Sequence, residues 1–342
     1  MKIDYTIAKN FRNLGPELRI KWEPGINLIL GPNGSGKTNL LESLSILTGW
    51  GVFPRSRNAN LITWNSDIFN AFTAAQLSGE ETFEVTANIT NRITLKLNDK
   101  VISYTDLRRA VPSIIFLTGS TNLIDGAPAY RRLFIDRLCS LFVPVYAKKL
   151  ADFRHVLQNR TALLRKGRSP EITSELFCQL GGFIMDKRRQ VLSHFKSLLS
   201  EEKYNFEMLP VINIPGKDYL HEALRHYSAR EVHALHPLCG PNYDELAITL
   251  CENNKPASEA LSRGQKRRLI LYTIITAGKL TAMILKREPV LLFDDLTAEL
   301  DSDGKRWTYQ ELVKTNWQAF ITAPEKPFDT ARNFGGIDFS VS

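Results

Sequence analysis

Apolar residues recur with two different periods in the first third of the chain. Residues 26–30 (INLIL) are a short apolar run, and leucines at helical spacing follow over residues 40–47, after a glycine-rich loop. This order predicts a strand, a loop and a helix. Between residues 82 and 104, apolar and polar positions alternate in three segments that are separated at Asn91 and at residues 98–99. The alternation predicts antiparallel strands joined by tight turns.

Residues 111–117 (VPSIIFL) predict one more buried strand. After it, apolar residues recur at helical spacing. The helical pattern extends from residue 130 to about 204, and we expect breaks at Pro144, at residues 166–170 (KGRSP) and at residues 181–182 (GG). No heptad pattern persists over several repeats, so the pattern predicts short helices and no long coiled-coil arm.

The pattern of alternating strands and helices returns after a stretch that contains four prolines. It predicts a helix over residues 264–286, a strand at 289–295, a helix at 305–314 and a strand at 318–322. We therefore expect an α/β protein with an inserted helical lobe. Its first unit comprises residues 1–125 and 205–342, with an antiparallel β subdomain at about 51–110, and its helical lobe comprises residues 126–204.

Composition indicates an ordinary globular protein of the cytoplasm. The 342 residues are 43% hydrophobic, enough for one large or two packed lobes. The four cysteines show neither CxxC pairs nor the spacing of a zinc site, so we expect buried, reduced thiols. We see no signal-peptide-like apolar block and no apolar run long enough to cross a bilayer, so we expect a soluble protein without a membrane partner.

Positive charge is concentrated in the predicted helical lobe. The whole chain carries a net charge of +8, and residues 131–189 alone contain 13 Lys and Arg against 5 Asp and Glu. This asymmetry favours a polyanionic partner, while charge alone is equally consistent with a basic solvated helical surface. The aromatic residues are not interleaved with the basic ones, which argues against a dedicated groove for single strands.

Residues 31–38 (GPNGSGKT) match the phosphate-binding pattern G-x-x-x-x-G-K-[ST] between a predicted strand and a predicted helix. Glycines let backbone N–H groups surround phosphate oxygens, and the start of the helix adds positive potential. Lys37 is expected to reach the β- and γ-phosphates and Thr38 to bind Mg²⁺. The predicted nucleotide-binding residues are Gly31, Pro32, Asn33, Gly34, Ser35, Gly36, Lys37 and Thr38.

Residues 291–301 (LLFDDLTAELD) supply the second half of such a site. The apolar strand ends in Asp294, where a carboxylate completes the Mg²⁺ shell, and Asp295 can orient the attacking water. Two aspartates after a strand are often only a helix cap, but the phosphate-binding loop favours the catalytic interpretation. The separation of 257 positions between Lys37 and Asp294 requires a large insertion between the two halves.

A third block, residues 261–266 (LSRGQK), contains no catalytic group. Together with the two other motifs, in this order, it resembles the signature motif of ABC-type ATPase heads. In those heads the motif binds the γ-phosphate of a nucleotide held by another subunit. The resemblance implies that Ser262, Gly264 and Gln265 complete the site of a second chain. One copy of each half-site per chain then implies a symmetric homodimer that encloses two ATP molecules.

Over nearly its whole length the chain resembles the RecF family. The resemblance is carried by residues 8–13 (AKNFRN), 31–43 (GPNGSGKTNLLES), 126–136 (GAPAYRRLFID), 261–266 and 291–301. Two blocks depart from the family pattern: GPNYDEL at 240–246 has Asn242 and Tyr243 in place of a His-Arg pair, and FLTGS at 116–120 replaces F-x-P-E-D. Ala323 stands where a switch histidine is expected, which leaves Thr322 as the candidate sensor of the γ-phosphate.

The resemblance implies an ABC-type P-loop ATPase head that uses ATP and Mg²⁺. It also implies ATP-driven dimerisation on gapped or junction DNA with slow hydrolysis. The expected roles are replication, recombinational repair and the SOS response to DNA damage, with recombination-mediator proteins as partners. Candidate DNA contacts are Arg131, Arg132, Lys148, Lys149, Arg165, Lys187 and Arg188, and binding through such cations is largely independent of sequence.

Three alternatives remain open from the sequence. Arg131 and Arg132 could contact nucleic acid or the other lobe, or form salt bridges with Asp136. The chain could be the ATPase subunit of a phage-defence system, whose head would have the same motifs. It could also serve a transporter, although Asp295 in place of a catalytic Glu and the basic insertion argue against that function.

Overall fold

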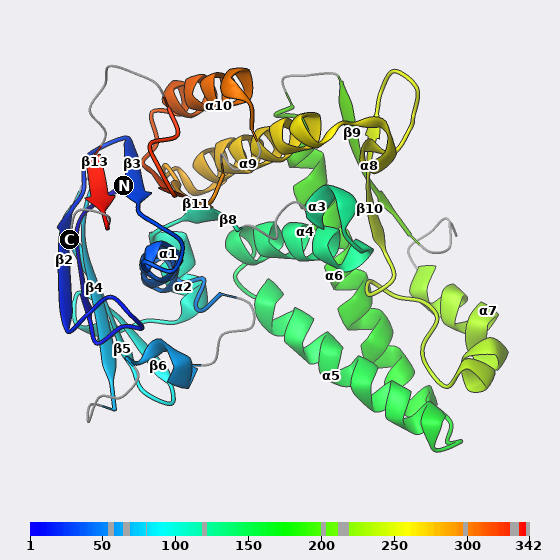
Figure 1. The fold of residues 1–342 in the computed structure, drawn as a ribbon. Coiled ribbons are helices and arrows are strands. Elements are labelled where there is room, and N and C mark those ends of the chain that lie inside the picture. Colours follow the sequence, from blue (N-terminus) through cyan, green and yellow to red (C-terminus); the bar gives the residue numbers. More distant parts are fainter. Residues whose placement is uncertain are drawn as a thin grey trace. The chain divides into compact units, whose positions relative to one another are not determined.

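The computed structural model in Figure 1 consists of two compact units. It describes residues 1–53, 58–63, 69–79, 81–117, 122–199, 203–210, 219–296, 300–328 and 335–339. Unit 1 comprises Met1–Ser120 and Arg263–Ser342, and unit 2 comprises Thr121–Ser262. The prediction of an α/β head interrupted by an inserted lobe is confirmed, with the end of the insertion displaced from residue 204 to residue 262.

A parallel sheet of five strands forms one layer of unit 1. Its strands, in spatial order, are β13 (Gly335–Asp338), β3 (Ile26–Leu30), β12 (Ala319–Ala323), β11 (Val290–Asp294) and β8 (Ser113–Phe116). The residues of β11 and β12 are all buried, which explains why these strands are continuous apolar runs in the sequence. Because all neighbours are parallel, the carboxyl ends of β3, β11 and β12 lie at one edge of the sheet.

A second sheet in unit 1 is antiparallel and contains six strands. In spatial order they are β2 (Glu17–Lys21), β1 (Lys2–Lys9), β4 (Ala71–Ser78), β5 (Phe83–Ile89), β6 (Ile93–Leu97) and β7 (Lys100–Val101). The predicted β subdomain at residues 51–110 is thus enlarged by two strands from the start of the chain. Helix α1 (Lys37–Leu47) contacts strands of both sheets, and one apolar core includes Leu44, Val85 and Phe320.

Further helices complete unit 1. They are the 3₁₀ turn η1 (Asn58–Leu61), α2 (Tyr104–Ala110), α9 (Arg263–Leu285) and α10 (Ser302–Thr315). Helix α9 contacts β8 and α10, and Gly278 allows the ring of Trp317 to pack against it: a Cβ atom there would lie 2.3 Å from Cζ3 of that ring.

By length and composition α9 could cross a membrane, with a mean hydropathy of 1.5 over 18 residues. The expectation that no apolar run reaches that length is corrected here, but 61% of the window is buried, as in a core helix of a soluble protein.

Unit 2 is mainly helical and also contains a pair of antiparallel strands. Its elements are α3 (Asn122–Asp125), α4 (Pro128–Phe142), α5 (Tyr146–Arg165), η3 (Glu171–Thr173), α6 (Ser174–Lys196), β9 (Tyr204–Leu209), α7 (Tyr219–Ala234), β10 (Glu245–Leu250) and α8 (Ala257–Ala260). Strands β9 and β10 pair with each other in antiparallel orientation, and they pack on α6 and α4 respectively. These contacts explain why residues 205–262 belong to unit 2 and not to the head.

Helix α6 continues without interruption through Gly181 and Gly182, so the predicted break there is wrong. A Cβ atom at Gly181 would lie 2.6 Å from Cδ1 of Leu220 on α7. The glycine therefore permits close packing of two helices and does not end one. The predicted breaks at Pro144 and residues 166–170 are confirmed, because α5 lies between them.

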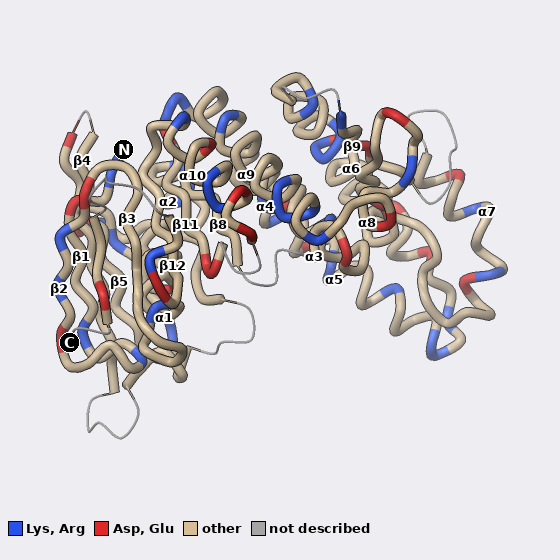
Figure 2. The backbone as a smooth tube through the Cα atoms, turned by 45° about the horizontal axis from the view of Figure 1, so that its top comes forward, with Lys and Arg blue, Asp and Glu red and all other residues tan. Residues whose placement is uncertain are grey.

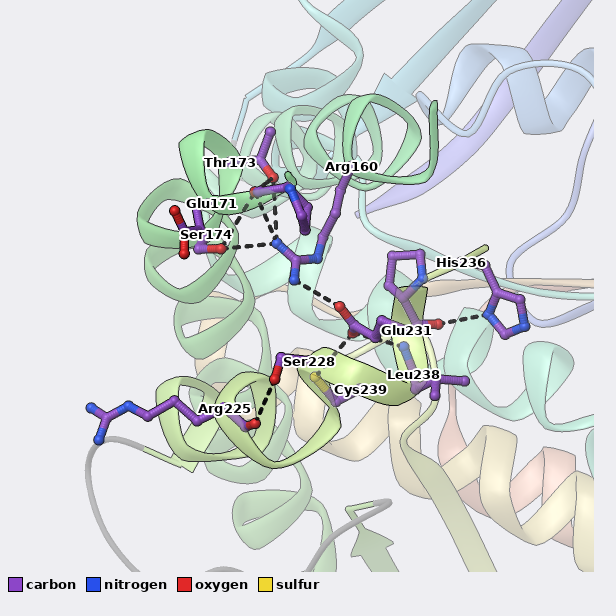
Figure 3. A network of polar contacts seen from close by, with 12 residues as sticks. Arg160, Glu171, Thr173, Ser174, Arg225, Ser228, Glu231, His236, Leu238 and Cys239 are labelled. Carbon is purple, nitrogen blue, oxygen red and sulfur yellow. Dashed lines mark hydrogen bonds and ion pairs between the residues drawn. The ribbon is translucent and has the colours of Figure 1, made fainter. Parts of the chain in front are cut away.

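A buried ion pair connects α5 with α7 in unit 2 (Figure 3). Nη2 of Arg160 donates to Oε2 of Glu231 at 2.7 Å, and both side chains are almost completely buried. Nη1 of Arg160 also donates to the carbonyl of Pro170 and to the hydroxyl of Ser174, while Oε1 of Glu231 accepts the backbone N–H of Leu238. Both charges are thus compensated by direct hydrogen bonds.

The four cysteines are free thiols. Cys139, Cys178 and Cys239 are buried as expected, whereas Cys251 is exposed, which corrects the expectation for that residue. Burial raises the pKa of Cys178 to about 11 and that of Cys239 to about 12, so both are protonated and unreactive near neutral pH. Among the described residues, no group of three or more His, Cys, Asp or Glu side chains is arranged to bind a metal ion.

The ion pair in Figure 3 generates a stability prediction. Replacement Glu231→Ala leaves the guanidinium of Arg160 buried without a counter-charge, so we expect the free energy of unfolding to fall by about 3–5 kcal/mol. The matched control is Lys314→Ala, which breaks an exposed pair with Glu311 and should cost at most about 1 kcal/mol. Urea unfolding followed by circular dichroism measures both. Equal losses for the two variants would contradict the role given to the buried pair.

Candidate nucleotide-binding site

The loop between β3 and α1 has a backbone that glycine adopts readily. Gly31, Gly34 and Gly36 have φ angles of 139°, 84° and 110°, all in the region that other residues rarely adopt. Gly36 is the N-cap of α1, and Lys37 is its first helical residue. The sequence motif thus lies where it was predicted, with the backbone N–H groups at the start of a helix available to an anion.

The interior of this loop fits phosphate oxygens. No atom lies within 4 Å of a Cβ atom built on Gly34, and Oγ of Ser35 is buried without a hydrogen-bond partner. Nζ of Lys37 donates to the carbonyls of Gly31 and Pro32 at 2.6 and 2.8 Å, which holds the ammonium group over the loop. Open space, an unused hydroxyl and a cation are the features that bound phosphate requires.

Asn13 braces the loop from the N-terminal segment. Its Nδ2 donates to the carbonyl of Gly34 at 3.0 Å, and its Oδ1 accepts from Nδ2 of Asn39 at 2.6 Å. A Cβ atom on Gly36 would lie 2.9 Å from Cδ2 of Leu14 and 3.0 Å from Oδ1 of Asn13. The sequence had identified Asn13 only as part of a family block. Its positioning role was missed because a contact across 21 residues leaves no local signal.

Asp294 is the centre of the site. Its Oδ1 accepts from the hydroxyl of Thr38 at 3.0 Å and from that of Thr322 at 2.8 Å, and only 8% of the residue is exposed. The hydroxyl of Thr322 also accepts the backbone N–H of Asp295 at 2.9 Å. Asp295 has a φ angle of 55°, a left-handed conformation that Asp tolerates better than most residues. The predicted Mg²⁺ ligands and the predicted water-orienting carboxylate therefore lie together, with Thr322 between them.

These groups border a pocket of about 480 Å³ within unit 1. Besides the loop, Asp294, Asp295 and Thr322, its lining includes Asn39, Leu300 and Ala323, which belong to the sequence motifs. It also includes four residues that the sequence did not indicate, Lys305, Pro324, Glu325 and Pro327. The volume and the mixture of cations, carboxylates and hydroxyls suit a phosphorylated ligand with a divalent cation.

The third motif begins α9. Leu261 is buried, while Ser262 and Gln265 are exposed, and no atom lies within 4 Å of a Cβ atom built on Gly264. Both polar side chains and the first turn of α9 can therefore be approached by another molecule. The expected action of these residues on a nucleotide of a second chain stays a prediction at this point.

Two parts of the sequence motifs lie outside the described residues. They are residues 118–120 of the FLTGS block and residues 297–299 of the block at 291–301.

In the other altered block, GPNYDEL at 240–246, the hydroxyl of Tyr243 donates to the carbonyl of Pro237. Asp244 in that block is buried, and burial raises its pKa to about 6 although Arg188 opposes the change. The block thus contributes to the interior of unit 2.

The structure removes Arg188 from the candidate DNA contacts. Only 2% of this residue is exposed, and its guanidinium donates to both carboxylate oxygens of Asp136, at 2.8 and 3.0 Å, and to the carbonyl of Pro241. A cation that is enclosed by protein acceptors cannot contact a phosphate backbone. Arg188 therefore holds α6 against α4 and the segment before β10.

Arg131 and Arg132 are also engaged within unit 2. Arg131 forms a bidentate pair with Glu245 on β10, at 2.5 and 3.2 Å, and Arg132 donates to the carbonyl of Asp244. The structural alternative for these residues is supported, although Asp136 is not the partner. Lys148, Lys149 and Arg165 on α5 are exposed, while Lys187 on α6 is partly buried and donates to Gln190.

Comparison with known proteins identifies similar sequences over almost the whole chain. The family model described as "RecF/RecN/SMC N terminal domain" matches residues 2–339. The DNA replication and repair protein RecF of Leptospira interrogans serovar Lai is 31% identical over 343 residues, which cover 95% of this chain and 92% of that protein. The protein of the same name from Heliobacterium modesticaldum is 29% identical over 94% of this chain and 92% of its own length.

Solved structures show the same fold. A structure of the recombination mediator protein RecF-ATPrS in the RecFOR pathway has a TM-score of 0.85 and 22% identity, covering 98% of this chain and 97% of that one. An Smc head bound to the C-terminal winged-helix domain of ScpA has a TM-score of 0.55 and 16% identity over 96% of this chain and 90% of that one. The shared architecture is that of an ABC-type ATPase head.

Proposed function

Because this chain belongs to the RecF family of SMC-like, ABC-type ATPases, we propose that it is an ATP-dependent DNA-binding protein of DNA replication and recombinational repair. The observation that supports nucleotide binding most strongly is the convergence of Thr38, Asp294 and Thr322 beside the glycine-rich loop. We assign the protein to the cytoplasm, with recombination-mediator proteins as partners.

ATP and Mg²⁺ fit the residues at this site. The backbone of residues 31–38 and Lys37 would hold the phosphates, and Thr38 and Asp294 would hold the metal ion. When bound, ATP supplies the phosphoanhydride bond and Mg²⁺ withdraws charge from its phosphates. Asp295 would orient the attacking water, and Thr322 would contact the terminal phosphate as its sensor.

Slow hydrolysis is the behaviour that we assign to this site. The carboxylate of Asp295 is one methylene group shorter than the Glu used in transporters, and the backbone N–H of Asp295 is bound by Thr322. Both features restrict how far its carboxylate can reach toward a water molecule. Nucleotide would then act as a switch between open and closed states, because ATP that binds better in the closed state shifts the population toward it.

The signature residues complete the mechanism in trans. Ser262, Gly264 and Gln265 are accessible at the start of α9, and Gly264 leaves room for a phosphate to approach the backbone. We therefore assign to the protein a symmetric homodimer in which each chain contributes the loop to one ATP and the signature to the other.

DNA would be bound through exposed cations of α5. Lys148, Lys149 and Arg165 are exposed on this helix, which belongs to the segment 131–189 with its 13 Lys and Arg against 5 Asp and Glu (Figure 2). Cations on a surface neutralise phosphates without reading bases, so binding should depend strongly on salt and little on sequence. We retain Lys187 as a weaker candidate, since the residue is partly buried and its ammonium group donates to Gln190.

The alternatives of a phage-defence or transporter subunit are not favoured. The curated relatives named above are replication and repair proteins that match 94–95% of this chain, including the helical unit.

The proposed dimer can be tested by measuring the mass of the protein. With ATP and Mg²⁺, the mass of the wild-type protein measured by light scattering should double, and the variant Ser262→Arg should remain monomeric because its side chain fills the space for the partner's phosphate. The control Ser193→Arg changes another exposed serine, on α6, and should dimerise like the wild type. A wild-type protein that stays monomeric, or a Ser262→Arg variant that dimerises normally, would show that no trans site forms.

The proposed DNA contacts of α5 can be tested by measuring DNA affinity. The double variant Lys148→Ala/Lys149→Ala should bind a fluorescent gapped duplex about tenfold more weakly at moderate salt. It should also reduce the steepness of log affinity against log salt concentration by about two, since two phosphate contacts are lost. The control Lys96→Ala/Lys100→Ala removes two exposed lysines of β6 and β7. If both double variants behave alike in anisotropy titrations, α5 is not a specific contact surface.

A further inference from the structure

A second lysine, outside the glycine-rich loop, lines the nucleotide pocket. Lys305 lies in the first turn of α10 and lines the pocket of about 480 Å³ together with Asp294, Asp295 and Thr322. The glycine-rich loop follows β3, whereas Lys305 belongs to the chain that follows β11. The two cations of the pocket, Lys37 and Lys305, therefore approach the enclosed space from different elements.

The start of α10 fixes the position of Lys305. The side chain of Asp301 accepts the backbone N–H of Gly304 at 2.7 Å, and the carbonyl of Asp301 accepts the backbone N–H of Lys305 at 2.9 Å. Gly304 is buried, and a Cβ atom there would lie 2.9 Å from Oδ1 of Asp301 and 3.3 Å from Cδ2 of Leu300. The tight cap determines where the lysine side chain begins and leaves its long stem to reach the pocket.

Charge explains what this lysine can bind. The pocket is lined by three carboxylates, of Asp294, Asp295 and Glu325, and by the two lysines. Lys37 already donates to two carbonyls of the loop. Within the described part of the chain, Lys305 forms no ion pair, whereas the next residue, Arg306, pairs with Asp303. A polyphosphate entering a pocket with this balance needs a further cation, and Lys305 can supply it.

We propose that Lys305 binds the terminal phosphate of ATP in the same chain and is a second phosphate-binding cation of the site. The proposal rests on the proposed binding of ATP. The loop would hold the inner phosphates, Lys37 would reach from the β- to the γ-phosphate, and the metal ion would lie between Thr38 and Asp294. Lys305 lines the same pocket as Asp295 and Glu325 but belongs neither to the loop nor to α1, so we assign its ammonium group to the terminal phosphate. ADP would lack the group that Lys305 contacts.

Calorimetric titration of the whole protein with ATPγS and with ADP, in the presence of Mg²⁺, tests this assignment. In Lys305→Ala the affinity for ATPγS should fall about tenfold, while the affinity for ADP stays within about twofold of the wild type. Lys305→Arg should retain most of the affinity for ATPγS because the charge is kept. The matched control Arg306→Ala changes the neighbouring cation, which does not line the pocket, and should leave both affinities unchanged.

The outcomes separate this proposal from the function on which it rests. Equal losses for ATPγS and ADP in Lys305→Ala would overturn it, because the lysine would then support the fold or the inner phosphates. Unchanged affinities for both would overturn it as well, while ATP binding itself would stand. If the wild type binds neither nucleotide, the proposed function fails together with the assignment of Lys305.

Discussion

The carboxylate of Asp294 is the interaction on which the rest of the site depends. A single oxygen of this group accepts hydroxyls from Thr38 at the start of α1 and from Thr322 at the end of β12. Asp294 and Thr322 lie at the ends of β11 and β12, and Thr38 follows β3 through the glycine-rich loop; parallel pairing brings the three strand ends to one edge. The hydrogen bond from Asp295 to Thr322 then connects the adjacent carboxylate to the same centre. Sheet topology thus brings the hydroxyls and carboxylates of separate motifs together in the site that we propose for Mg²⁺ and phosphate.

Unit 2 depends on a different constraint, the pairing of buried charges. Arg160 with Glu231 and Arg188 with Asp136 each join segments more than 50 residues apart in the sequence. Removing a partner from such a pair costs several kcal/mol, so these arginines are bound to the fold and unavailable to a ligand. Exposed cations, among them Lys148 and Lys149 on α5, are available to an anionic partner. Interior and surface charge therefore serve separate purposes in this unit.

Much of the head could be predicted from the sequence because its signals are local. The strands at residues 26–30 and 290–294 are continuous apolar runs, and the loop motif defines its own glycine backbone. The features that the sequence did not predict depend on contacts between residues far apart in the chain. Neither Asn13 nor Lys305 has neighbours in sequence that reveal a pocket, and charge counting cannot separate buried Arg188 from exposed Lys148. The Gly181-Gly182 pair predicts a helix break, and the contact that explains Gly181, with Leu220, is too distant in sequence to be predicted.

The central claim is that Asp294 binds the metal ion that accompanies ATP. Equilibrium binding of ATP with and without Mg²⁺, compared between the wild type and Asp294→Asn, tests it most directly. Asparagine keeps an oxygen for the hydroxyls of Thr38 and Thr322 but removes the charge that attracts the ion. We expect Mg²⁺ to strengthen ATP binding in the wild type and to have little effect on ATP binding in the variant. An equal gain from Mg²⁺ in both proteins would contradict it.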